Sequence, residues 1–107
     1  MIRELDSSDE LEEALREQPA VFYKHSPRCW MSTRAMRHIK KYAGAVGAPP
    51  VFLIDVIARR ELSNVLSERS GVPHASPQVI VMRGGRTQWH ASHLGISARA
   101  LAANTSE

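Results

Sequence analysis

Cys29 is the single cysteine among 107 residues, and it stands in the sequence Cys29-Trp30-Met31-Ser32. An apolar run and a polar loop precede it, which predicts that a helix begins near this residue. The first N–H groups of a helix lack partners within the helix, and the helix dipole adds positive potential, so both favour a thiolate. Ser32, one turn further on, could donate a hydrogen bond to that sulfur from its hydroxyl or its N–H. We therefore predict a nucleophilic Cys29, although free cysteines are also commonly buried structural residues.

A single thiol limits the reactions open to the chain. It excludes an intrachain disulfide, a zinc knuckle built from several cysteines and a dithiol redox couple. A thiolate attacks a disulfide through a mixed-disulfide intermediate, which a second cysteine ordinarily resolves. Ser32 occupies the place of that second cysteine and cannot form a disulfide, so we expect an external thiol to complete the cycle. The five histidines show no metal-ligand spacing, and we expect neither a metal nor a bound cofactor.

Basic residues flank Cys29 in the sequence, with Lys24 and Arg28 before it and Arg34 after it. Arginine binds carboxylates in a bidentate manner, so these residues favour an anionic substrate. The net charge is only +3, and the 6% of aromatic residues do not interleave with basic ones, so a stacking platform for nucleic acid is missing. We also find no secretory signal and no apolar stretch near the roughly 18–20 residues of a membrane span. A cytoplasmic protein without nucleic-acid or membrane partners is expected.

Alternating strands and helices must position these residues. We predict strands at Ile2–Leu5, Ala20–Lys24, Val51–Ile57, Gln78–Arg83 and Thr87–His90. Helices are predicted after the capping box of Ser7 and Glu10, from Cys29 to Ala43, around Leu62–Leu66 and after Ser97. Gly84-Gly85 joins the last two strands as a hairpin turn. The order predicts one α/β domain over residues 1–107, with a mixed central sheet of four to five strands flanked by helices.

Further motifs make the chain resemble a known family. Ser76-Pro77 directly precedes a predicted strand, a position where proline is tolerated. Together with Lys24-His25-Ser26, Cys29-x-x-Ser32, residues 71–78 (GVPHASPQ) and Ser92-His93, it resembles the monothiol bacilliredoxins, which are thioredoxin-like proteins. The similarity covers nearly the whole chain and implies a thioredoxin-like three-layer sandwich. Where members usually read Cys-Pro-Ile-Ser, this chain has Trp30 and Met31, which bears on substrate preference rather than on the class of reaction.

The resemblance also implies a function and a site. Cys29 would remove bacillithiol, a glucosaminyl-malate conjugate of cysteine, from S-bacillithiolated client proteins, and a low-molecular-weight thiol would regenerate it. Pro77 would be a cis-proline facing Cys29, and Ser76 would present its backbone to the adduct. The residues expected to bind substrate are Lys24, His25, Ser26, Arg28, Trp30, His74, Ser76 and Pro77. Arg28 is predicted to contact the malate carboxylates, whereas His25, His74 and His93 receive no defined role.

Other hypotheses remain open from the residues alone. The chain could be a non-catalytic thioredoxin-like adaptor with an inert cysteine, which thiol titration of the native protein would detect. It could also be a dimeric iron–sulfur carrier, in which Cys29 of each subunit and two small thiols complete four ligands. A Cys-His hydrolase is disfavoured because Pro77 would occupy the space that an acyl group needs. The sequence does not predict the oligomeric state.

Overall fold

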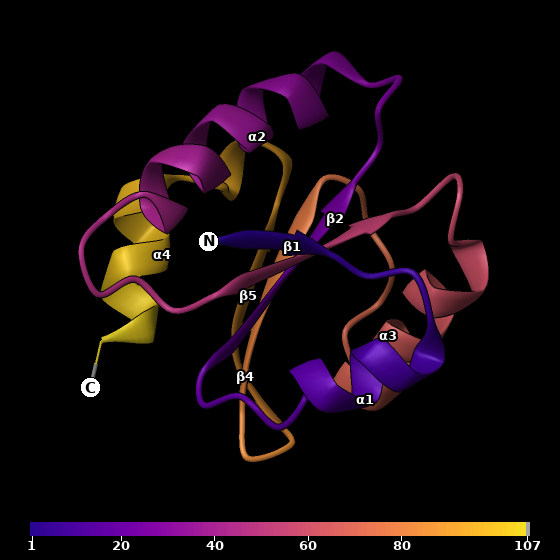
Figure 1. Ribbon diagram of the computed structural model, residues 1–107. Coiled ribbons are helices and arrows are strands. Elements are labelled where there is room, and N and C mark those ends of the chain that lie inside the picture. The colour runs from indigo at the N-terminus through magenta and orange to yellow at the C-terminus, as the bar shows by residue number, and fades with distance from the viewer. Residues whose placement is uncertain (107) are drawn as a thin grey trace.

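Five strands form one mixed sheet in the computed structural model, which describes residues 1–106 (Figure 1). The strands are β1 (Ile2–Glu4), β2 (Ala20–His25), β3 (Val51–Asp55), β4 (Gln78–Arg83) and β5 (Arg86–Ser92), in the spatial order β1-β3-β2-β4-β5. Strands β1 and β2 run parallel to β3, whereas β4 is antiparallel to both β2 and β5. The predicted mixed sheet with a terminal antiparallel hairpin is therefore confirmed.

Helices cover both faces of this sheet (Figure 1). They are α1 (Ser8–Ala14), α2 (Trp30–Ala43), α3 (Arg60–Ser70) and α4 (Ala98–Thr105), with the short 3-10 helix η1 (His93–Gly95) after β5. Phe22 and Ile80 belong to the core that α1 and α3 cover, whereas Tyr23 and Ile39 belong to the core on the α2 and α4 side. Phe22 and Tyr23 are adjacent in β2 and face opposite layers because side chains alternate along a strand. The result is the predicted three-layer sandwich.

The starts of α1 and α4 follow from local side-chain contacts. The Ser7 hydroxyl accepts from the Glu10 N–H at 3.2 Å, which confirms the predicted N-cap of α1. The Glu10 carboxylate reaches back to the Asp6 N–H at 2.8 Å, one residue before the N-cap, rather than to the Ser7 N–H of a capping box. The Ser97 hydroxyl accepts from the Ala100 N–H at 3.0 Å and caps α4. These signals lie within a few residues of one another, which is why the sequence alone predicted them.

The predicted strand at Val51–Ile57 is two residues too long, since β3 ends at Asp55. The Asp55 carboxylate accepts from the N–H groups of Ile57 and Ala58, each at 2.9 Å, and turns the chain toward α3. The apolar pattern continued through Ile57, but that side chain is 48% exposed. A side-chain hydrogen bond to the backbone thus ends the strand before the apolar run does. Strand β5 is longer than the predicted Thr87–His90, and β1 ends one residue before the predicted Leu5.

Candidate active site

Cys29 is the N-cap residue of α2, with extended backbone angles of φ −109° and ψ 126°. Its carbonyl accepts from the N–H groups of Ser32 at 3.0 Å and Thr33 at 3.2 Å. The N–H groups of Trp30 and Met31 find no acceptor among residues 1–106. No acidic residue lies in the first turn of α2. A sulfur anion at this position therefore meets unpaired N–H groups and the positive end of a helix, as the sequence predicted.

Ser32 is fully buried and supports the loop that carries the thiol. Its hydroxyl accepts from the Ser26 N–H at 3.1 Å, and its carbonyl accepts from the Tyr23 hydroxyl at 3.0 Å. Its own N–H donates to the Cys29 carbonyl, so the prediction that this N–H donates to the thiolate is wrong. Within the described residues no hydrogen bond reaches the sulfur of Cys29, and the residue as a whole is half-buried.

Tyr23 connects this loop to His25. Its hydroxyl lies 2.8 Å from His25 Nδ1. The single hydroxyl proton goes to the Ser32 carbonyl, so Nδ1 of His25 must carry the proton that it donates to Tyr23. Burial raises the pKa of Tyr23, and the negative charge of Cys29 raises it further, so the phenol stays protonated. Burial lowers the pKa of His25, an effect that Asp55 partly offsets. The sequence did not single out Tyr23, since its apolar strand indicated only a core residue.

Lys24 is fully buried, which argues against the predicted contact with substrate. Its side chain is 0% exposed and points toward α3, because it follows Tyr23 on the alternating strand β2. The Nζ atom donates to the Ser67 hydroxyl at 2.7 Å and lies 3.1 Å from Nδ1 of His74. Burial lowers the pKa of Lys24 to about 8. Lys24 is therefore a buried cation behind the site and not one of its surface contacts.

The Ser76–Pro77 peptide bond is cis, as the family resemblance implied. Gln78, the next residue, pairs with Lys24, so Ser76 and Pro77 lie beside the end of β2 from which the Cys29 loop departs. The Ser76 hydroxyl is buried and has no partner within residues 1–106. The His93 N–H donates to the Pro77 carbonyl at 3.0 Å, which places η1 against the proline. The chain segments predicted to surround the thiol are thus brought to one edge of the sheet.

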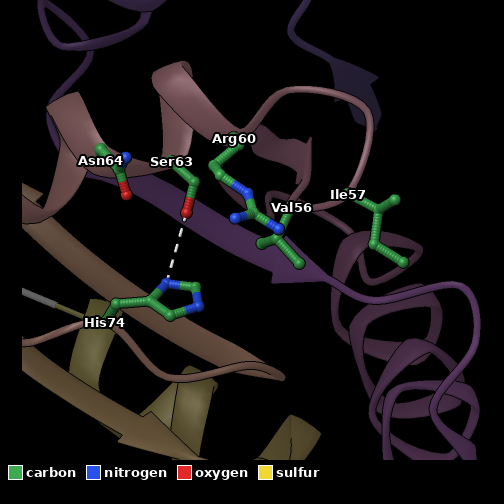
Figure 2. Close-up of a pocket in the computed structure, with 6 residues that line it drawn as sticks. All are labelled: Val56, Ile57, Arg60, Ser63, Asn64 and His74. Atoms are coloured by element: carbon green, nitrogen blue, oxygen red, sulfur yellow. Dashed lines mark hydrogen bonds between the residues drawn. The ribbon is translucent and has the colours of Figure 1, made fainter.

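The remaining predicted residues differ in how exposed their side chains are and in whether they already make hydrogen bonds. Trp30 is 67% exposed next to the thiol, and Arg28 is exposed without a hydrogen bond or ion pair to any described residue. Arg34, in contrast, donates to the Ile96 carbonyl at 3.2 Å and is held against the segment before α4. His74 contacts the Ser63 hydroxyl of α3 through Nδ1 at 3.3 Å (Figure 2). Arg28 and Trp30 can meet a substrate directly.

No group of three or more His, Cys, Asp or Glu side chains in residues 1–106 could hold a metal ion. Within the same residues, every helix is too short or too polar to cross a membrane.

Solved structures share this architecture. One that is described as having a thioredoxin fold is 26% identical, with a TM-score of 0.89 over 98% of this chain and 94% of that chain. Trxlp from Edwardsiella tarda EIB202 is 15% identical, with a TM-score of 0.77 over 100% of both chains. Thioredoxin from Malassezia sympodialis is 11% identical, with a TM-score of 0.77 over 99% of this chain and 92% of that chain. The last two similarities concern the fold alone.

A comparison of the sequence with known protein families identifies the family of this chain. The family model described as monothiol bacilliredoxin BrxC matches residues 2–101, which contain Cys29, Ser32 and Pro77. The thioredoxin-like fold and the family predicted from the sequence motifs are both confirmed. Membership in a thioredoxin-like oxidoreductase family supports thiol–disulfide redox activity. This chain belongs to the monothiol bacilliredoxin family.

Proposed function

We propose that the protein is a monothiol thiol–disulfide oxidoreductase that removes bacillithiol from S-bacillithiolated proteins. The observation that carries this proposal is the position of the half-buried Cys29 at the N-cap of α2, with the Ser32 hydroxyl where a resolving thiol would stand. Membership in the monothiol bacilliredoxin family supports the choice of bacillithiol as the thiol that is transferred. The proposed compartment is the cytoplasm, where thiols are kept reduced.

The proposed reaction has two exchange steps. In the first, the Cys29 thiolate attacks the bacillithiol sulfur of the mixed disulfide, forming a Cys29–bacillithiol disulfide and releasing the client cysteine as a thiolate. In the second, a small thiolate attacks that disulfide, restores the Cys29 thiolate and leaves as a disulfide with bacillithiol. Each step breaks one S–S bond and forms another. The two electrons that reduce the client come from the second small thiol, because Ser32 cannot supply them.

Exposed apolar side chains support a protein as the first substrate. Trp30 is 67% exposed, Ile57 48% and Leu94 62%. Trp30 follows Cys29, Ile57 lies just beyond β3, and Leu94 lies in η1 next to the residue that binds Pro77. Large apolar residues that stay exposed around a reactive group are typical of protein contact surfaces. We propose that they contact the client while Cys29 removes its cap.

Mass spectrometry tests the first exchange step. The reduced protein is incubated near neutral pH with a bacillithiolated client, and both proteins are then analysed intact. We expect the bacillithiol mass on Cys29 and its loss from the client. Cys29→Ser should leave the client capped, whereas the control Thr33→Ala, an exposed change in the same turn, should behave as the wild type. A wild-type protein that leaves the client fully capped would refute the proposed activity.

Thiol titration tests the adaptor hypothesis. A half-buried Cys29 should react with a thiol reagent in the native protein, whereas an inert cysteine would react only after denaturation. The same experiment with the bacillithiol adduct should show no reactive thiol, because Cys29 is the only cysteine. Native Cys29 that resists the reagent would favour the adaptor.

A further inference from the structure

A hollow of about 340 Å³ opens beside the end of β3 (Figure 2). Its walls come from the segment after β3, the start of α3 and the segment before β4. The residues that line it are Val56, Ile57, Arg60, Ser63, Asn64 and His74. This volume lies at the lower end of the range of roughly 300–1,000 Å³ that is typical of small-ligand sites. The hollow is large enough for part of a small molecule.

The hollow and the thiol share one edge of the sheet. The Val56 N–H donates to the His25 carbonyl at 3.0 Å, so one wall is joined to the end of β2, from which the Cys29 loop departs. On another wall, His74 lies three residues before Pro77, whose segment borders the same end of β2. Figure 2 shows β2 passing behind the hollow. A molecule bound to the Cys29 sulfur can therefore extend toward the hollow.

The lining of the hollow is cationic and rich in hydrogen-bond donors. Arg60 makes no hydrogen bond or ion pair with any other residue from 1 to 106, so its guanidinium is available to a ligand. Ser63 and Asn64 add a hydroxyl and an amide. No carboxylate lines the hollow in the described part of the chain: neither Asp55 nor Glu61 is among its walls. The balance of charge favours an anion.

Lys24 determines which ring nitrogen of His74 carries the proton. Its Nζ atom carries only donors and lies 3.1 Å from Nδ1 of His74, and the Ser63 hydroxyl approaches the same atom at 3.3 Å. Nδ1 therefore accepts, and the ring proton must sit on Nε2, on the side away from Ser63 (Figure 2). Burial lowers the pKa of His74, and the charges of Lys24 and Arg60 lower it further. His74 is thus a neutral donor through Nε2.

We infer that this hollow binds the carboxylate-bearing end of the small thiol that forms a disulfide with Cys29. Arg60 pairs with a carboxylate in a bidentate manner, and the Nε2–H of His74 donates to the same end of the ligand. Lys24 acts through His74 and is a positioning residue. The inference rests on the proposed function, because that function supplies a thiol with a malate end.

Client caps of different charge test the site kinetically. One client is prepared with a bacillithiol cap and, separately, with an uncharged 2-mercaptoethanol cap. Arg60→Gln should slow removal of the bacillithiol cap about 10- to 100-fold, since hydrogen bonds to charged groups contribute roughly 1.5–3 kcal/mol. Removal of the uncharged cap should be unchanged, and Arg99→Gln, an exposed change on α4, should alter neither rate. Equal effects of Arg60→Gln on both caps, or none, would overturn the inference.

A binding experiment separates this site from the exchange reaction. In Cys29→Ser, malate is titrated while the ring signals of His74 are followed by NMR, with succinamide as the uncharged control. We expect malate alone to shift the His74 signals and Arg60→Gln to abolish the shift. If malate does not shift the His74 signals, or shifts them equally when Arg60 is replaced by Gln, the inference is overturned. If malate binds but the wild type leaves bacillithiolated clients intact, the proposed function fails while the dicarboxylate site stands.

Discussion

The Nζ atom of Lys24 lies 3.1 Å from Nδ1 of His74, although 50 positions separate the two residues in the sequence. Lys24 belongs to β2 and is completely buried, whereas His74 lies in the segment before the cis Pro77 and borders the hollow beside α3. A buried ammonium group thus sets the proton position of a histidine at the surface. This contact links the interior of the sheet to the edge at which Cys29 reacts.

Lys24 should make the stability of the protein depend on alkaline pH. Burial lowers its pKa from 10.5 to about 8, so the folded chain binds fewer protons than the unfolded chain between these values. The free energy of unfolding should therefore rise with pH across this window, relative to Lys24→Met, by about 3 kcal/mol. Chemical denaturation at pH 7 and pH 10.5 measures the difference. Lys40→Met, at an exposed position of α2, serves as the control and should show no such rise. A constant difference between wild type and Lys24→Met would contradict the assigned burial penalty.

Ser32→Cys should convert the protein into a dithiol enzyme. Cys29 would still attack the bacillithiol sulfur, but the new thiol, one turn along α2, would displace bacillithiol and form an intramolecular disulfide. Intact mass spectrometry after treatment with oxidised bacillithiol should show a stable adduct on the wild type and a disulfide on the variant. Thr33→Cys is the matched control, because its exposed side chain follows Ser32 in the same turn. An adduct that persists equally in Ser32→Cys would show that residue 32 does not reach the sulfur.

Tyr23→Phe should affect both stability and exchange. The change removes the hydroxyl that donates to the Ser32 carbonyl and accepts from His25, and the cost of a buried unpaired group is about 1–3 kcal/mol. Tyr42→Phe is the control, since it removes a comparable buried hydrogen bond of 2.8 Å to Thr105 at the other end of α2. Denaturation should show that both variants are less stable, whereas stopped-flow exchange should be slower only for Tyr23→Phe. Equal exchange rates in the two variants would limit Tyr23 to a structural role.

Arg28→Ala should slow removal of the bacillithiol cap by no more than about fivefold, because an exposed ion pair contributes at most roughly 1 kcal/mol. Arg28 is exposed next to Cys29 and has no partner among the described residues. Rates are compared with those on the uncharged cap and with Arg37→Ala, an exposed arginine further along α2. An unchanged rate on the bacillithiol cap would remove Arg28 from the predicted substrate contacts.

The sequence by itself determined the features that depend on neighbouring residues. The N-cap of α1 at Ser7, the single thiol at the start of α2 and the serine in place of a resolving cysteine all lie within a few positions of their partners. Alternation of element types predicted the mixed sheet, and the family motifs predicted the cis Pro77. Apart from the cis Pro77, which only the family resemblance implied, these features required helix geometry, capping chemistry and strand periodicity.

Only the tertiary structure decided which side chains of β2 face the thiol. Periodicity indicates that Tyr23 and Lys24 point to opposite faces, but not which face packs against α2. Packing placed Tyr23 beside Ser32 and buried Lys24 beside Ser67 of α3, where its charge acts on His74. Arg60 and His74 likewise meet at one hollow because β3 and β4 flank β2, so the end of β3 and the segment before β4 come to the same end of the sheet. Contacts of this kind join residues far apart in the chain, and the order of strands in the sheet determines them.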